Sequence, residues 1–98
     1  MNISTNSTTT VLSTKISRRK YPEARIIVLD DNFNSFEHVA NSLVEIIPGM
    51  SEKRAWELAI EVDGEGSAEV WRGPLEQAEL YHNQLVKKGL TMAPIEKT

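Results

Sequence analysis

The sequence predicts an α+β fold in which three helices cover one face of a small three-stranded antiparallel sheet, in the order βααβαβ. Two kinds of pattern indicate this class. Short runs that are β-branched or alternate between apolar and polar residues are typical of strands, whereas longer segments repeat apolar residues at the three- and four-residue steps of an amphipathic helix. The 98 residues allow one domain, because single cores commonly occupy about 100 to 150 residues.

The first strand is predicted at residues 26–29, where four consecutive apolar residues are mostly β-branched. Such a run fits a buried strand better than a helix of the same length. It leads directly into three polar residues, Asp30, Asp31 and Asn32. Their oxygens lie at the rim of the sheet, where they either hold a cation (a metal or an ammonium) or simply hydrate a loop.

Two helices follow this strand. The first is capped by Asn34 or Ser35, and a proline–glycine pair ends it. The second is capped by Ser51 and is broken by the segment 63–66, which contains two glycines. Asp63 also makes the end of the second helix acidic. If this helix packs across the sheet, the two acidic ends approach each other and form a candidate pocket.

The remaining elements are a strand, a helix and a last strand. Residues 67–72 alternate, which predicts Ala68 and Val70 on one face and Glu69 and Trp71 on the other. A third helix then starts at a proline and ends at a glycine. The last strand is expected at residues 91–95. It must lie at an edge of the sheet, because its proline lacks a backbone donor.

Composition excludes several classes of function. There is no cysteine, which excludes disulfides, thiolate metal sites and a cysteine nucleophile. Residues 1–20 carry four basic side chains and no acid, whereas the rest of the chain carries seven basic and fourteen acidic ones. An acidic body without a basic stripe argues against nucleic-acid partners, and no run reaches the roughly 20 apolar residues of a membrane span. We therefore expect a cytoplasmic protein that binds neither nucleic acid nor membrane.

The N-terminal segment differs from the body. Nine of the first 20 residues are Ser or Thr, with almost no apolar periodicity. We predict a disordered extension at residues 1–22 and a single domain at residues 23–98. Because Ser- and Thr-rich, acid-poor segments are also typical of organelle transit peptides, a plastid stroma is the alternative location.

An enzyme is not indicated. His38 and His82 lie in predicted helices and are expected to be surface or boundary residues, and no Ser–His–Asp motif, phosphate loop or zinc spacing is present. No cofactor is expected. Trp56 and Trp71 either fill the core, which is the favoured interpretation, or are exposed aromatic residues that bind a partner. A receiver domain also ends a strand in two aspartates, but such domains alternate five strands with five helices, for which this chain is too short.

The body of the chain also carries short motifs in a fixed order. They are Asp30-Asp31 after the first strand, Glu37-His38-Val39, Pro48-Gly49-Met50, Trp71-Arg72-Gly73-Pro74-Leu75 and Lys88-Gly89-Leu90. In this order and spacing residues 24–98 resemble the ClpS family, adaptors that recognise destabilising N-terminal residues and hand the substrate to a Clp ATPase and protease. The last three motifs are similar to cyanobacterial and plastid members. The resemblance implies a ClpC-type ATPase as partner, whose N-terminal domain the folded body would contact.

The resemblance also implies a binding site. In the family, an Asn and two acids after the first strand, with a His at the end of the second helix, bind the α-ammonium of the substrate. The matching positions are Asp30, Asp31, Asn32 and Asp63. The side-chain pocket would consist of Asn34, Phe36, Val39, Ala59, Val62 and Met92, with Leu90 or Thr91 as alternatives to Met92.

The site departs from the family pattern at several positions. The usual Asn has become Asp30, the second acid Asn32 and the His Asp63. These changes keep an alternative open, a Clp-docking regulator that has reduced or lost recognition of N-terminal residues. In the pocket, Ala59 stands where the family has a Met and Phe36 adds bulk at the entrance. The accepted N-terminal residues should therefore differ from the usual Leu, Phe, Tyr and Trp.

Overall fold

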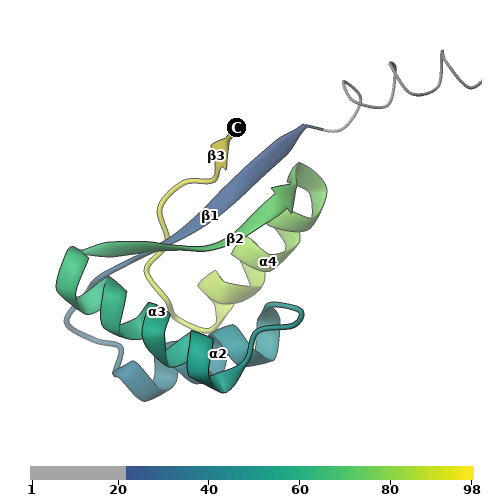
Figure 1. Ribbon diagram of the computed structural model, residues 1–98. Helices are drawn as coiled ribbons and strands as arrows, with labels where there is room; N and C mark the ends of the chain where they lie inside the picture. The colour runs from purple at the N-terminus through teal and green to yellow at the C-terminus, as the bar shows by residue number, and fades with distance from the viewer. Residues whose placement is uncertain (1–21) are drawn as a thin grey trace, which may run out of the picture.

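A three-stranded antiparallel sheet with three helices packed on it forms the folded part of the chain (Figure 1). The computed structural model describes residues 22–98. Its elements are β1 (Glu23–Leu29), α2 (Phe36–Ile46), α3 (Glu52–Glu65), β2 (Ser67–Pro74), α4 (Leu75–Lys87) and β3 (Glu96–Lys97). The predicted α+β class and the βααβαβ order are confirmed. Except for Pro22, the predicted disordered extension at residues 1–22 lies outside the described residues.

β1 is the central strand, in the order β2-β1-β3, and both pairings are antiparallel. Alternate residues of β1, namely Ala24, Ile26 and Val28, are almost completely buried beneath the helices. The side chains between them are only partly buried. The helices therefore cover one face of the sheet, as the sequence predicts, and α4 lies against both β1 and β2.

A β-bulge interrupts the pairing of β1 with β2. Ile26 pairs with Trp71 and Ile27 pairs with Glu69, so Val70 is an extra residue in β2. The bulge brings Trp71 to the face of Ile26, where Trp71 packs against the core. Its ring meets the ring of Tyr81 edge-on, with 5.1 Å between the two ring centroids. The prediction that Trp71 shares a face with Glu69 is wrong, because strict alternation fails at a bulge. Trp71 is partly buried and packs against the core.

The last strand is shorter and later than predicted. Only Glu96–Lys97 forms β3, whereas the predicted strand at residues 91–95 contributes a single bridge from Met92 to Val28. Pro94 lies between the two paired segments and has no N–H to continue the ladder. The predicted position at the edge of the sheet is confirmed.

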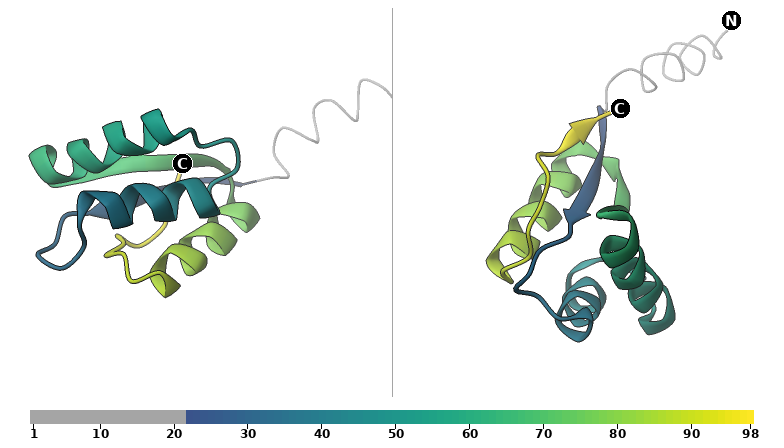
Figure 2. Two further views of the ribbon diagram at one scale, coloured as in Figure 1. Left: turned by 90° about the horizontal axis from the view of Figure 1, so that it is seen from below. Right: turned by 90° about the vertical axis from the view of Figure 1, so that its left-hand side faces the viewer.

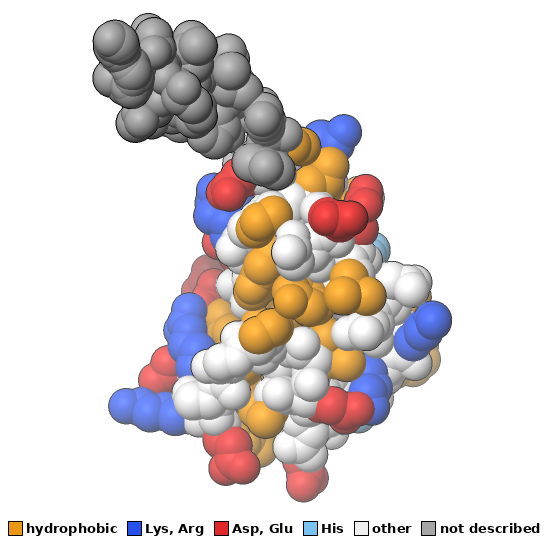
Figure 3. Space-filling view, turned by 90° about the vertical axis from the view of Figure 1, so that its right-hand side faces the viewer, with side chains coloured by type: hydrophobic (Ala, Val, Ile, Leu, Met, Phe, Trp, Pro, Cys, Tyr) orange, Lys and Arg blue, Asp and Glu red, His pale blue; other side chains and the backbone are white. Residues whose placement is uncertain are grey.

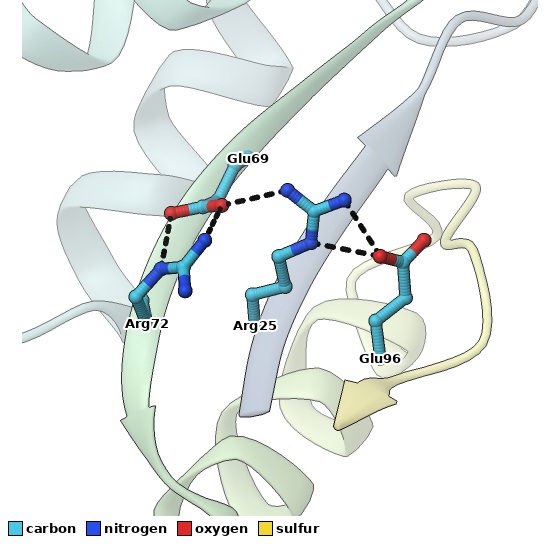
Figure 4. Close-up of polar contacts among 4 residues, drawn as sticks. All are labelled: Arg25, Glu69, Arg72 and Glu96. Carbon is cyan, nitrogen blue, oxygen red and sulfur yellow. Dashed lines mark hydrogen bonds and ion pairs between the residues drawn. The ribbon is translucent and has the colours of Figure 1, made fainter. Parts of the chain in front are cut away.

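The outer face of the sheet carries an ion network across all three strands (Figure 4). Arg25 on β1 lies between two glutamates, with 3.1 Å from Nη1 to Glu69 Oε1 and 2.6 Å from Nη2 to Glu96 Oε1. Arg72 Nη2 lies 2.9 Å from the same Glu69 oxygen. The pKa of Glu69 is lowered, first by the hydrogen bonds from Arg72 and also by Arg25. The network fixes β2 and β3 against the central strand.

Side-chain caps define the helices. The hydroxyl oxygens of Ser35 and Ser51 accept hydrogen bonds from the backbone N–H three residues later, which starts α2 and α3. α3 continues through the predicted break at residues 63–66 as far as Glu65. It ends at Gly66, whose φ of 90° is in the left-handed region.

α2 and α3 lie side by side, and α4 runs along the sheet at an angle to them (Figure 2). On the face drawn in Figure 3, Lys and Arg side chains are scattered among Asp and Glu around a central apolar area, without a continuous basic stripe. None of the helices in the described part is long and apolar enough to cross a membrane.

Candidate functional site

A small cavity opens where the end of β1, the start of α2 and the end of α3 meet. Its volume is about 50 Å³. Eight of the residues predicted from the sequence line it: Asp30, Asp31, Asn34, Phe36, Val39, Ala59, Val62 and Asp63. The fold therefore brings together residues from the loop after β1 and from two helices.

Two of the predicted site residues lie outside this lining. Asn32 is exposed in the loop after β1, and Met92 is partly buried against the core, but neither lines the cavity. The segment after α4 contributes Leu90 and Thr91 instead, the two alternatives to Met92. Thr91 accepts from the N–H of Leu29 at 2.8 Å through its backbone oxygen, which fixes this segment beside the end of β1.

The acidic ends of β1 and α3 meet through Gly66. The N–H of Asp30 donates to the carbonyl of Gly66 at 2.9 Å, and the N–H of Gly66 donates to the carbonyl of Val62 at the same distance. Asp30 is thereby joined to the last turn of α3, which carries Asp63. Both aspartates are exposed at the rim of the cavity.

The carboxylate of Asp31 is held by the chain's own donors. Oδ1 accepts from the N–H groups of Phe33 and Asn34 at 2.9 and 2.8 Å. Oδ2 accepts from Asn34 Nδ2 at 2.7 Å and from the Thr91 hydroxyl at 2.6 Å. These bonds, led by the one from Thr91, hold the pKa of Asp31 well below its usual range. Because a carboxylate offers about four acceptor positions, the chain itself occupies those of Asp31.

The side chains of Asn34 and His38 fix the wall that follows α4, a role that was not predicted from the sequence. Asn34 Nδ2 also donates to the carbonyl of Gly89 at 3.0 Å. His38 Nε2 donates to the carbonyl of Lys88 at 2.7 Å, since a carbonyl oxygen only accepts. His38 is exposed, as predicted, but it is a structural donor. No local pattern predicts these bonds, because their partners are 50 or more residues away.

The interior of the cavity is apolar. Val39, Ala59 and Val62 are 7%, 2% and 4% exposed, and Leu90 is also buried. Phe36 is 43% exposed and therefore lies at the mouth. A rim of carboxylates above an interior of hydrocarbon suits a ligand that combines a cationic group with an apolar one. In residues 22–98 no cluster of three or more His, Cys, Asp or Glu side chains could hold a metal ion.

Comparison with known proteins identifies the family. The family model described as "ATP-dependent Clp protease adaptor protein ClpS" matches residues 19–93. The chain belongs to the ClpS family. The resemblance stated from the sequence motifs is confirmed. By the family's description, its members are adaptors of a protease.

Several ClpS proteins that are similar to this chain in sequence are cyanobacterial. The "ATP-dependent Clp protease adapter protein ClpS" of Thermosynechococcus vestitus is 56% identical over 82 residues, which cover 84% of this chain and 87% of that protein. Its counterpart in Synechocystis sp. is 56% identical over 84 residues, which cover 86% of each chain. The predicted similarity to cyanobacterial members is confirmed.

A solved ClpS structure has the same fold. Agrobacterium tumefaciens ClpS2 bound to L-phenylalaninamide superimposes with a TM-score of 0.69 over 81% of this chain and all of that chain, at 21% sequence identity. At this identity the match concerns the fold alone.

Proposed function

We propose that this ClpS protein binds the free N-terminal residue of a substrate polypeptide in the cavity and delivers the substrate to a ClpC-type ATPase and its ClpP protease. The observation that carries the proposal is the position of Asp30 and Asp63, which come from separate elements and meet at the rim of one apolar cavity. An N-terminal residue has the matching chemistry, because its ammonium and its side chain are attached to the same carbon atom. The L-phenylalaninamide bound by the related ClpS2 also combines a free amine with an apolar side chain.

The carboxylates of Asp30 and Asp63 have a different role from the carboxylate of Asp31. Among the described residues, no side chain donates to the carboxylate of Asp30 or Asp63, so both can accept hydrogen bonds from an ammonium. Asp31 adds negative charge beside them, although its acceptor positions are occupied. We therefore assign the direct ammonium contacts to Asp30 and Asp63, and to Asp31 the positioning of the loop.

The energies of the two contacts suit an adaptor that must release its cargo. Each hydrogen bond between charged partners contributes roughly 1.5 to 3 kcal/mol, and burial of a Leu or Phe side chain contributes about 1.5 to 3 kcal/mol. Association costs several kcal/mol in lost freedom of motion. What remains after this cost is a weak contact that is readily reversed. A bound ammonium would place its positive charge beside the carboxylates that line the rim.

The partner and the location follow from the family. The family is described as an adaptor of an ATP-dependent protease, which supports the ATPase of that protease as the partner. We propose a ClpC-type ATPase and a cytoplasmic location from the resemblance of the sequence motifs to cyanobacterial members. The folded body, residues 23–98, is the part that would contact the N-terminal domain of the ATPase. The adaptor needs no catalytic group of its own.

Fluorescence anisotropy with labelled peptides tests the ammonium site. A peptide with a free N-terminus should bind at least about tenfold more tightly than its acetylated form, because acetylation removes the positive charge. Asp30→Ala together with Asp63→Ala should remove most of this difference. Glu61→Ala is the matched control, since Glu61 is an exposed acid of α3 that does not line the cavity. Equal affinity for free and acetylated peptides would reject the site.

The alternative function is a regulator that contacts the Clp ATPase without binding N-terminal residues. Its support is the small cavity, since about 50 Å³ holds only roughly three to five water-sized groups. Binding to ClpC without any amine-dependent peptide binding would favour this alternative.

A further inference from the structure

Apolar surface continues outward from the mouth of the cavity along α2 and α3. Phe36 lines the cavity, and its ring meets that of Trp56 edge-on, with 6.4 Å between the ring centroids and 85° between the planes. Trp56 is 41% exposed, so its predicted place in the core is wrong. Ile60 is 57% exposed. Three large apolar side chains are therefore in water beside the candidate site.

Helical spacing places this surface next to the acidic rim. Trp56, Ile60 and Asp63 follow one another at steps of four and three residues, so they lie along the same side of α3. Ala59 and Val62, on the adjacent side, line the cavity itself. The apolar row on α3 thus ends at one of the two carboxylates to which we assign the ammonium.

The contact between Phe36 and Trp56 gives this surface a defined shape. Edge-to-face packing restrains both rings, so that little further freedom is lost when a ligand covers them. A single exposed apolar residue needs no special explanation, but a contiguous patch beside a binding cavity indicates a contact surface.

We propose that Phe36, Trp56 and Ile60 form an apolar ledge that contacts the side chain of the second residue of the bound polypeptide. This inference rests on the proposed function. When the first side chain enters the cavity and its ammonium lies at the acidic rim, the next Cα atom is only about 3.8 Å away, at the mouth where Phe36 lies. The ledge therefore favours substrates whose second residue is large and apolar.

Peptides that differ only at residue two test the ledge. We compare free-amine peptides that begin Leu-Phe and Leu-Ser, together with their acetylated forms, by fluorescence anisotropy. The wild-type protein should bind the Phe peptide about tenfold more tightly, because the ledge buries its ring. Trp56→Ala should reduce this preference to about twofold or less. Leu80→Ala is the matched control, since Leu80 is similarly exposed on α4, and it should leave the preference unchanged.

Ile60→Ser provides an independent variant if circular dichroism shows that Trp56→Ala does not fold, and it should also weaken the preference for Phe. Equal affinity for the two free-amine peptides would overturn the ledge and leave the ammonium site intact. An unchanged preference in the folded Trp56→Ala or Ile60→Ser variants would do the same. If the wild-type protein instead bound the free-amine peptides and their acetylated forms with equal affinity, both the proposed function and the ledge would be overturned.

Discussion

Thr91 donates its hydroxyl to the carboxylate of Asp31, with 2.6 Å between Oγ1 and Oδ2, although the two residues are 60 positions apart in the sequence. The same carboxylate accepts two backbone N–H groups of the loop after β1. One side chain thus fixes both the loop that carries Asp30 and the segment that forms the opposite wall of the cavity. The shape of the candidate site depends on this bond.

Asp31→Asn should destabilise the protein at neutral pH and much less in acid. The pKa of Asp31 is lower in the folded protein than the usual value of about 3.9 in an unfolded chain. Its contribution is therefore fully present above about pH 4 and is lost as the pH falls towards the folded pKa. We expect a loss of about 1 to 2 kcal/mol at pH 7, because the charged acceptor is replaced. Urea unfolding of both proteins at a series of pH values from 7 to 2 measures the difference, which should shrink progressively below about pH 4.

Thr91→Val provides the control for this assignment. Thr91→Val removes the hydroxyl donor and keeps the size of the side chain. It should therefore destabilise the wild-type protein more than it destabilises the Asp31→Asn variant. Purely additive effects of the two substitutions would show that the bond does not couple the loop to the last segment.

Gly66→Ala and Gly64→Ala should have opposite effects on stability. Gly66 ends α3 with a φ of 90°, where a Cβ atom is strained, so alanine should cost about 1 kcal/mol. Gly64 lies within α3, and an added Cβ atom meets nothing within 4 Å, so alanine should stabilise by about 0.5 to 1 kcal/mol. Thermal unfolding measures both. Destabilisation by both substitutions would contradict the assigned end of the helix.

Ala59→Phe should close the cavity to large side chains. Ala59 is 2% exposed and lines a cavity of about 50 Å³, which the added phenyl ring would fill. Peptides that begin with Leu or Phe should lose at least about tenfold in affinity, because their side chains are no longer buried. Peptides that begin with Ala, which need little of the cavity, should lose much less. Unchanged binding of the Leu and Phe peptides would place the side-chain pocket elsewhere.

Glu69→Gln should weaken the ion network on the outer face of the sheet. Glu69 accepts from both Arg25 and Arg72, and its carboxylate is partly exposed. We expect a loss of about 0.5 to 1 kcal/mol at low salt, and a smaller loss at about 1 M salt, where charges are screened within about 3 Å. Glu57→Gln is the control, because its single exposed pair with Arg54 at 3.4 Å should contribute little. Equal losses at both salt concentrations would contradict the role of charge.

The sequence by itself determined the order of the elements and the starts of α2 and α3, but not the end of α3 or the bounds of the last strand. The β-branched run of β1 and the serine caps of two helices act within a few residues, so their patterns are visible without the fold. The acidic ends of β1 and α3 were predicted for the same reason. The family resemblance predicted which residues from distant parts of the chain form the site. Eight of the ten residues predicted in this way line one cavity.

Only the tertiary structure decided which side chains face the core and which complete the site. The bulge at Val70 moved Trp71 to the covered face, while Trp56 remained exposed against Phe36. The wall formed by Leu90 and Thr91 depends on bonds to residues 50 to 60 positions earlier in the chain. Local preferences cannot determine such choices, because the energy of a buried surface or a long-range hydrogen bond depends on partners that only folding brings together.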